Sequence, residues 1–303
     1  LTADSVVVAD QLTPGQFLAL ERRFLRGLIL GHAGVTSHTV ILARSFGIPT
    51  LSGVADLAGS PLDGQEAIVD AECGLLATEL TPPARRYYAL EQRRLAGRRA
   101  RQEKLAAQPA ITADGRRVDV AGNISTAAEA PAAFTAGAEG IGLFRTEMLF
   151  LDRDEPPGEN EQFEEYRAAL LTAGDRPVIL RTLDIGGDKP LAYLNLPTED
   201  NPFLGYRAVR IYPEFETIFR TQVRALVRAS AHGKLRVMIP MVTTLEELRW
   251  ARRVIREEQA RCAEEGLAFD AAMPVGTMIE VPAAALCLGA FTRRLQFLSI
   301  GTN

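Results

Sequence analysis

Residues 178–189 read VILRTLDIGGDK: a short apolar run that ends at Arg181 and is followed by the paired glycines Gly186 and Gly187. An apolar run of this length, bounded by turn residues, predicts a buried strand. Amphipathic stretches that favour helices lie on either side of it, at 161–171 and 212–231. Alternation of buried strands with helices predicts βα units and a parallel sheet.

The same alternation extends from about residue 110 to the end of the 303-residue chain. Strands are predicted at 118–121, 140–144, 178–181, 235–239, 275–279 and 297–300, and a further helix at 244–265. Polar or charged residues follow these runs, namely Asn123, Arg145, Arg181, Glu280 and Asn303. A (β/α)8 TIM-type barrel gathers its functional residues at the carboxyl ends of its strands. We therefore predict an α/β fold with a TIM-type barrel that stops after about six strands.

Before the barrel, residues 1–81 alternate short apolar runs with turns and predict a small α/β domain. Its strands are expected at 5–9, 27–30, 49–51 and 66–70, and a helix at 36–46 that ends at Gly47. Thr13 followed by Pro14 is typical of a helix start. The densely charged stretch 82–108 predicts a solvated linker helix rather than a nucleic-acid-binding one. The expected division is thus 1–81, 82–108 and 109–303.

Composition excludes several classes of protein. With 34 basic and 38 acidic residues the net charge is −4, which argues against a nucleic-acid binder. No apolar run approaches the ~20 residues of a membrane span, so membrane insertion is not expected. Cys73, Cys262 and Cys287 are widely spaced without a CxxC motif. Each is expected to be a small buried side chain in a reducing compartment, which predicts a cytoplasmic protein.

His38 is the candidate nucleophile. It lies in GVTSHTVILARSFGIP, residues 34–49, in the first turn of a predicted helix. The positive end of the helix dipole lowers the pKa of such an imidazole and keeps it neutral, and the free N–H groups stabilise a phosphate attached to the ring. Position alone favours the alternative, a capping histidine without a catalytic task.

Two arginines at neighbouring strand ends, Arg145 and Arg181, are candidates for binding one anion, because the guanidinium fork suits phosphate and carboxylate. Lys189 adds a further positive charge. The alternative is that each arginine pairs with a nearby acid such as Glu147 or Asp184.

Glu280 also ends a strand. A lone carboxylate there suits Mg²⁺, which usually takes one or two carboxylates plus phosphate oxygens of the substrate. The loop that follows FLSI at 297–300 is small and polar, as in phosphate-binding loops. Phosphoryl transfer between a histidine domain and a barrel that binds a small phosphorylated acid is the simplest hypothesis.

Long segments of the chain carry a more specific signal. They are GVTSHTVILARSFGIPTLSGV, GIGLFRTEMLFLDRDEPPGENEQFEEYR, VILRTLDIGGDKPLAYLNLPTEDNPFLGYRAVRI, VMIPMV, VGTMIEVPAA and FLSIGTN. In this order they resemble Enzyme I, the phosphoenolpyruvate–protein phosphotransferase of the bacterial sugar phosphotransferase system. An Enzyme I unit within a multiphosphoryl transfer protein fits equally well. Related dikinases share several motifs but usually have alanine where this chain has Thr39.

The resemblance implies an enzyme with a swivelling β/β/α phosphohistidine domain before a barrel that binds phosphoenolpyruvate (PEP). It implies that His38 takes the phosphoryl group on Nε2 and passes it to the carrier protein HPr. It implies that Arg145 and Arg181 bind the phosphate and carboxylate of PEP, that Asn303 contacts the phosphate, and that Lys189 supports the site. Glu280 would ligate Mg²⁺, and the full-length protein is expected to be a homodimer.

Departures from the family pattern set further expectations. A second metal-binding aspartate, another arginine and a catalytic cysteine lie beyond the position of Asn303 in the family, and the HPr-docking domain precedes the first residue. The chain is therefore expected to be an internal piece of a longer protein, weakly active or inactive by itself. A dikinase fragment and a non-catalytic phosphorelay module remain the alternatives.

Overall fold

The computed structural model describes residues 1–32, 38–54, 64–151, 153–186, 191, 193, 194, 196, 197, 199 and 205–301, with the backbone alone at 14, 18, 38, 41, 42 and 45. The chain divides into two compact units, Leu1–Arg99 and Ala100–Asn303. Each unit is built around its own hydrophobic core. None of the described helices is long and apolar enough to cross a bilayer.

The first unit contains a parallel sheet in the order β1-β2-β3, formed by β1 (Ser5–Ala9), β2 (Leu25–Leu30) and β3 (Thr50–Ser52). Its helices are α1 (Pro14–Leu18) and α2 (His38–Ser45), with a 3₁₀ turn at Arg22–Phe24. Two short antiparallel strands, β4 (Ile68–Asp70) and β5 (Leu75–Ala77), complete it. Thr13 caps α1 through a reciprocal capping box with Gln16, which confirms the predicted helix start.

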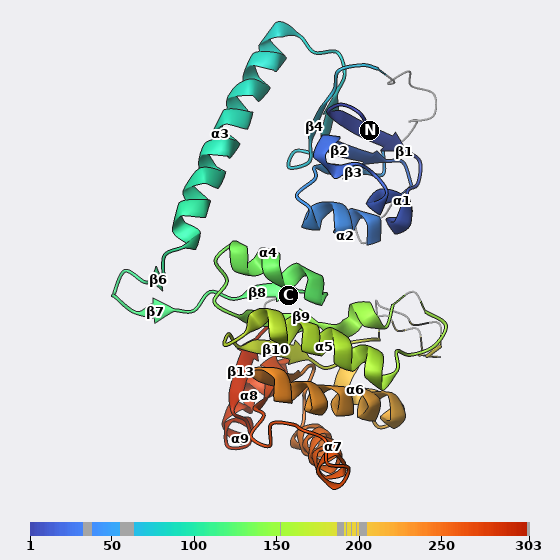
Figure 1. The fold of residues 1–303 in the computed structure, drawn as a ribbon, viewed down its shortest axis with the longest axis vertical. Coiled ribbons are helices and arrows are strands. Elements are labelled where there is room, and N and C mark those ends of the chain that lie inside the picture. Colours follow the sequence, from blue (N-terminus) through green and yellow to red (C-terminus); the bar gives the residue numbers. More distant parts are fainter. Residues whose placement is uncertain are drawn as a thin grey trace. The chain divides into compact units, whose positions relative to one another are not determined.

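The helix α3 (Pro82–Ala106) is long and exposed. The structure describes all 25 of its residues and buries none of them. It carries eight basic and two acidic residues, and Arg85 forms an ion pair with Glu66. A solvated helix was predicted here, and Figure 1 shows it as a single straight rod. The border between the two compact units falls inside this helix.

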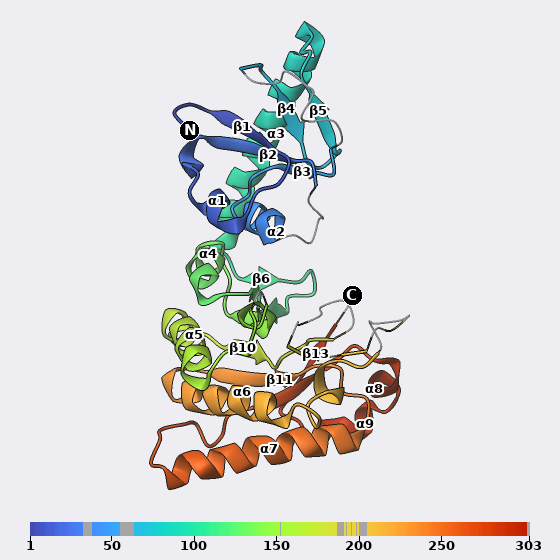
Figure 2. The ribbon, with the colours of Figure 1, turned by 90° about the vertical axis from the view of Figure 1, so that its right-hand side faces the viewer.

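Six parallel strands in sequential order form the sheet of the second unit: β8 (Gly122–Ile124), β9 (Ile141–Arg145), β10 (Val178–Arg181), β11 (Leu235–Ile239), β12 (Val275–Ile279) and β13 (Phe297–Ile300). Each strand pairs in parallel with the next along the chain. These are six consecutive strands of a TIM-type barrel, as predicted. Figure 2 shows this sheet with the helices against it.

The predicted first strand of this sheet was wrong. Residues 118–121 contain two valines that are both about half exposed, Val118 and Val120. Part of that run belongs to a hairpin of β6 (Ala110–Ile111) and β7 (Arg117–Val118). The first sheet strand is instead β8, where Ile124 is buried and Asn123 lies within the strand rather than after it.

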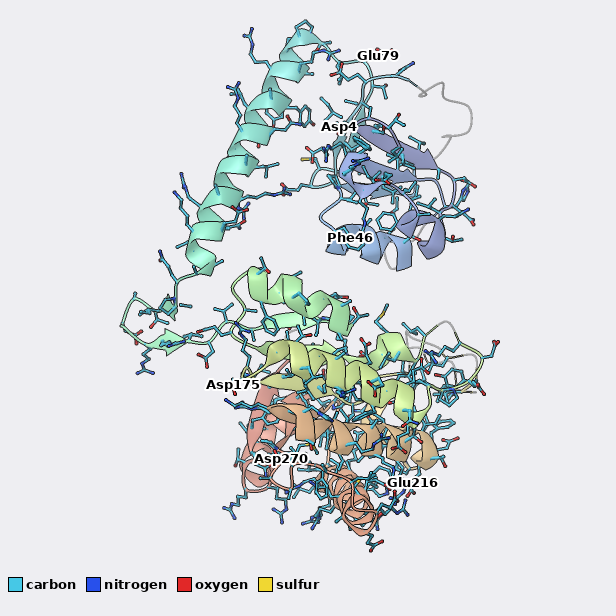
Figure 3. All side chains as sticks on the ribbon, in the orientation of Figure 1. Asp4, Phe46, Glu79, Asp175, Glu216 and Asp270 are labelled. Atoms are coloured by element: carbon cyan, nitrogen blue, oxygen red, sulfur yellow. The ribbon has the colours of Figure 1, made fainter. Side chains whose placement is uncertain are left out.

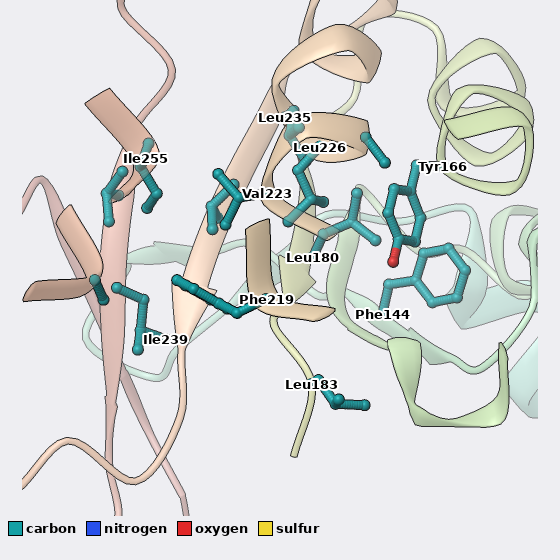
Figure 4. Close-up of a cluster of buried hydrophobic side chains, with 14 of the residues drawn as sticks. Phe144, Tyr166, Leu180, Leu183, Phe219, Val223, Leu226, Leu235, Ile239 and Ile255 are labelled. Carbon is teal, nitrogen blue, oxygen red and sulfur yellow. The ribbon is translucent and has the colours of Figure 1, made fainter. Parts of the chain in front are cut away.

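Helices α5 (Glu159–Ala173), α6 (Glu216–Ala229) and α7 (Leu245–Glu264) pack side by side along the sheet (Figures 1 and 2). Shorter helices are α4 (Ala130–Thr135), α8 (Pro282–Leu286) and α9 (Leu288–Thr292). Short 3₁₀ turns occur at Ala127–Glu129, Thr146–Leu149, Ala208–Arg210 and Ser230–His232. Figure 4 shows how Phe219, Val223 and Leu226 of α6 join Phe144 of β9 and Leu180 of β10 in one core.

The outer surface of α6 carries an arginine belt, defined as Arg220, Arg224 and Arg228. The four-residue spacing places these side chains on one face of the helix. Arg220 bonds Glu216, Glu257 and Glu258 at 2.5–2.8 Å, so it ties α6 to α7. Arg224 and Arg228 both bond Glu159 at the start of α5. The belt therefore connects α6 to both neighbouring helices.

The cysteines correct one expectation. Cys262 is buried on α7, as predicted, but Cys73 and Cys287 are exposed. Burial raises the pKa of the Cys262 thiol, despite the opposing effect of Arg224. Only one of the three is therefore a core side chain.

Candidate functional site

The carboxyl ends of β9 and β10 bring together the two arginines singled out in the sequence. Arg145 and Arg181 end adjacent strands and are register partners across the sheet. Arg145 is exposed and forms no hydrogen bond or ion pair with any residue that the structure describes. Its guanidinium is thus available to a ligand, whereas that of Arg181 is buried with 6% exposure.

Arg181 is held by two buried carboxylates. Its Nη2 bonds Glu147, and its Nη1 lies 3.0 Å from Oδ2 of Asp184. Burial opposes the charge of Arg181, but the carboxylates of Glu147, Asp184 and Glu280 outweigh it and raise the pKa of the guanidinium. The alternative stated for the arginines, pairing with these acids, therefore holds for Arg181, whereas Arg145 pairs with no acid in the described part of the chain.

Arg207 is a third arginine of this group, and the sequence analysis did not single it out. Its Nε and Nη2 both lie 2.9 Å from Oδ1 of Asp184, so one carboxylate bridges Arg207 and Arg181. Arg207 is not at a strand end. An isolated antiparallel bridge to Gly186 brings it back to the site from a later loop.

The bridge explains why glycine stands at position 186. Its φ is +125°, and a Cβ there would lie 2.6 Å from both the Cβ of Arg207 and the carbonyl oxygen of Tyr206. Two non-glycine residues nearby, Ala208 and Met241, also adopt positive φ, at 53° and 59°. Such backbone conformations are costly and tend to occur at functional sites.

Glu280 follows β12 and is partly buried. Its Oε1 accepts a hydrogen bond from the backbone N–H of Met241 at 2.8 Å. Desolvation, together with the charge of Asp184, raises the pKa of Glu280 above its ordinary value. The Met241 N–H, Arg181 and Arg207 act in the opposite direction but do not outweigh it. Glu280 thus lies at the carboxyl end of the same sheet as Arg181, with β11 between their two strands.

The donor set at Glu280 fits Mg²⁺ only in part. Among the described residues no cluster of three or more histidine, cysteine or acidic side chains could hold a metal ion. Mg²⁺ often binds one or two carboxylates and completes its shell with water and substrate phosphate oxygens. Glu280, a partly desolvated carboxylate at the carboxyl end of the sheet, suits that mode of binding.

In the first unit, α2 begins at His38, after the end of β2. The buried Thr39 hydroxyl anchors this turn by donating to the carbonyl oxygen of Leu12 at 2.6 Å. Val40 and Ala43 then pack into the core. His38 therefore stands at the amino end of a helix, where the sequence predicted it.

A second histidine lies at the same edge of the small sheet. Nδ1 of His32 is hydrogen-bonded to Oδ1 of Asp10, and both side chains are exposed. A Cβ at Gly31 would lie 2.5 Å from that carboxylate oxygen, so a larger residue there would displace the Asp10 side chain. Spacing along the chain gave no signal for this pair, because Asp10 follows β1 and His32 follows β2, and the parallel pairing of the two strands brings these ends together.

Lys189 and Asn303 lie outside the described residues. The described part of the loop after β13 ends at Gly301, whose N–H donates to the carbonyl oxygen of Ile279 at 3.1 Å. Of the predicted barrel residues, the structure thus places Arg145, Arg181 and Glu280 at the carboxyl end of one sheet. It adds Glu147, Asp184 and Arg207, which are linked to Arg181.

Comparison with known proteins agrees with this architecture. Residues 99–303 match the family described as PEP-utilising enzyme, PEP-binding domain, and residues 1–74 match the PEP-utilising enzyme, mobile domain. The chain belongs to the PEP-utilising enzyme family.

Over all 303 residues the chain is 48% identical to multiphosphoryl transfer protein 1 of Escherichia coli K12, of which it covers 36%. It is 41% identical to the phosphoenolpyruvate-protein phosphotransferase of Geobacillus stearothermophilus, of which it covers 52%. The chain thus spans from about a third to about half of the length of these relatives. The resemblance to Enzyme I is confirmed.

Proposed function

We propose that this chain takes part in phosphoryl transfer from PEP to His38, the first step of a phosphotransferase relay that continues to an HPr-type carrier. The observation that carries the proposal is the convergence of Arg145, Arg181 and Arg207 at adjoining elements of one barrel. PEP offers a phosphate and a carboxylate, two anions that match guanidinium groups. The names of the relatives support PEP as the substrate.

In this proposal the three arginines have different roles in binding PEP. Arg145, which has no partner among the residues that the structure describes, reaches the ligand. Arg181 and Arg207 are kept in place by the shared carboxylate of Asp184 and present a fixed positive charge to the phosphate. Catalysis of phosphoryl transfer depends mainly on such positioning and charge stabilisation.

Mg²⁺ would be held by Glu280 together with oxygens of the substrate. When bound, the ion supplies charge neutralisation at the phosphate. The same proposal includes Asn303 as a contact to the substrate phosphate and Lys189 as a residue that supports the substrate site.

His38 receives the phosphoryl group on Nε2. The bond between phosphorus and the enol oxygen of PEP breaks, a phosphorus–nitrogen bond forms, and the enolate released takes a proton to become pyruvate. A neutral imidazole at a helix amino end is suited to this step, because the lone pair is free and the backbone N–H groups favour the phosphate.

We further propose the division into a mobile histidine domain (1–81), a linker helix (82–108) and the PEP-binding barrel (109–303). We propose that the longer protein to which the relatives correspond is homodimeric. The chain alone is expected to be weakly active or inactive.

Labelling with radioactive PEP and Mg²⁺ tests the function. Wild-type chain should gain acid-labile, base-stable label, slowly, and His38→Ala should gain none. His232→Ala is the matched control and should label as wild type does, since His232 belongs to the second unit, where its ring packs against Phe163. Phosphorylated HPr supplies the label by the reverse route. Absence of label at His38 by both routes would refute the proposal.

A further inference from the structure

We propose that Gln222, on α6, is a positioning residue that fixes the backbone bearing Arg181 and so sets where that guanidinium points. The inference rests on the proposed function for the identity of the ligand. The hydrogen bonds that carry it are properties of the fold alone.

The side chain of Gln222 is fully buried and uses both ends of its amide. Oε1 accepts a hydrogen bond from the backbone N–H of Leu183 at 2.8 Å. Nε2 donates to the hydroxyl of Thr146 at 3.1 Å and to the hydroxyl of Tyr166 at 3.2 Å. One side chain thus connects the segment after β9 with the segment after β10.

Thr146 completes the connection to the arginine. Its hydroxyl donates to the backbone carbonyl oxygen of Arg181 at 2.9 Å while accepting from Gln222. Thr146 lies between Arg145 and Glu147 in the chain, and Leu183 precedes Asp184. Gln222 therefore fastens the residues next to the charged groups of the site without touching those groups.

The surrounding groups leave this network little freedom. The hydroxyl of Tyr212 donates to the carbonyl oxygen of Leu183 at 2.6 Å and lies 2.8 Å from the hydroxyl of Thr182. Burial raises the pKa of Tyr212 well above its usual range, so the hydroxyl keeps its proton. On the other side the Tyr166 hydroxyl donates to Oε1 of Gln162 at 3.1 Å. Buried polar networks whose members are all satisfied specify one arrangement of the chain.

The position of Gln222 on its helix is otherwise apolar. Its neighbours Phe219, Val223 and Leu226 pack into the barrel core (Figure 4), where a leucine or methionine would suit the same face. A buried amide is costly unless its hydrogen bonds are made. Its presence on this face is explained by the two strand-end segments that it holds.

The backbone matters for Arg181 because its guanidinium is held through its two Nη atoms and not through Nε. Nε of Arg181 is buried without a hydrogen-bond partner among the described residues. Its two Nη atoms bond Glu147 and Asp184, which lie on the two segments that Gln222 connects. Movement of either segment would move the guanidinium, and binding sites tolerate only about 0.5 Å of such displacement.

Four variants of the chain separate positioning from stability. Gln222→Met removes the central amide, and Thr146→Val removes the hydroxyl that reaches Arg181. Thr146→Ser keeps that hydroxyl and is the conservative rescue. Tyr166→Phe is the matched control, because it removes a buried hydroxyl from the same network on the side away from Arg181.

Isothermal titration with PEP and Mg²⁺ gives the affinities, and thermal melting of each variant gives its stability. We expect Gln222→Met and Thr146→Val to bind PEP at least tenfold more weakly. Thr146→Ser and Tyr166→Phe should bind within about twofold of wild type, although Tyr166→Phe melts at a lower temperature. A merely structural role predicts that affinity follows melting temperature in all four, and that result would overturn the inference.

A ligand-free measurement keeps failure of the inference distinct from failure of the proposed function. The Arg181 side-chain N–H signals, assigned with Arg181→Lys, are compared by NMR among the same variants. If wild type does not bind PEP, the proposed substrate is wrong, and the NMR signals decide the inference. The inference is supported if the Arg181 signals shift in Gln222→Met and Thr146→Val but not in Tyr166→Phe. Unchanged Arg181 signals in the first two variants refute the inference.

Discussion

Replacement of Asp184 by asparagine is a direct test of the arginine–carboxylate group. Asp184 is 3% exposed and lies between Arg181 and Arg207, which are each 6% exposed. The substitution keeps the shape of the side chain but removes the charge that both guanidinium groups share. Loss of one partner from a buried ion pair costs about 3–5 kcal/mol. Because the amide oxygen still accepts a hydrogen bond, we take the lower value, about 3 kcal/mol.

The assay is thermal unfolding in a buffer free of phosphate and sulfate. A unit the size of Ala100–Asn303 shifts by about 2–4 °C for each kcal/mol, so the expected loss is roughly 6–12 °C. The control is Asp175→Asn, labelled in Figure 3 at the surface, where its carboxylate is fully exposed and 3.9 Å from Nζ of Lys234. Asp175→Asn should leave the melting temperature unchanged.

The same variant makes a second, linked expectation. Two buried arginines with less negative charge between them should bind an added dianion more tightly than wild type does. Inorganic phosphate should therefore restore more of the melting temperature in Asp184→Asn than it adds in wild type. A variant that melts within about 2 °C of wild type and gains nothing extra from phosphate would refute the reasoning.

Three further expectations follow from single groups. Thr244→Ala removes the capping box that starts α7 and should lower the free energy of unfolding by about 1 kcal/mol in urea titrations, whereas Thr244→Ser should not. A thiol reagent should modify Cys73 and Cys287 in the native protein and Cys262 only on unfolding; fast native labelling of Cys262 would contradict its burial. The pKa of Glu280 is raised by desolvation, so its carboxylate is lost on acidification at a higher pH than the ordinary 4.5. Mg²⁺-dependent PEP binding, titrated from pH 8 downward, should weaken at that higher pH, and a midpoint at or below the ordinary value would be contrary evidence.

Strands of the barrel were predictable because burial on both faces leaves an uninterrupted apolar run. The strands at 178–181, 235–239, 275–279 and 297–300 were predicted with the bounds that the structure has. The first strand was not, because β8 begins at Gly122, where a Cβ would lie 2.9 Å from that of Ala133. A strand that needs glycine where it approaches a helix has few apolar residues to identify it. The more apolar run at 118–121 was therefore assigned as the strand instead.

The candidate site, like the sheet, could be predicted in part. Arg145, Arg181 and Glu280 could be singled out because each ends a strand, and strand ends of a barrel meet at one rim. Arg207 could not, since its place depends on a bridge between two loops. Gln222 gave no signal either: an amide on a helix normally indicates the solvent face, and only the fold shows that it points inward.

The arginine belt has a consequence for redesign of the barrel. Arg220, Arg224 and Arg228 fasten the outer face of α6 to α5 and α7, and Gln222 fastens its inner face to the segments that follow β9 and β10. The helix is thus held on both faces, and the contacts on its outer and inner sides together fix its rotation about its own axis. A design that replaces α6 with the helix of a relative must therefore keep the glutamate partners of the arginine belt. Replacement of the belt by lysine would weaken the same contacts. In both cases a rotation of α6 would shift the strand-end segments that Gln222 holds.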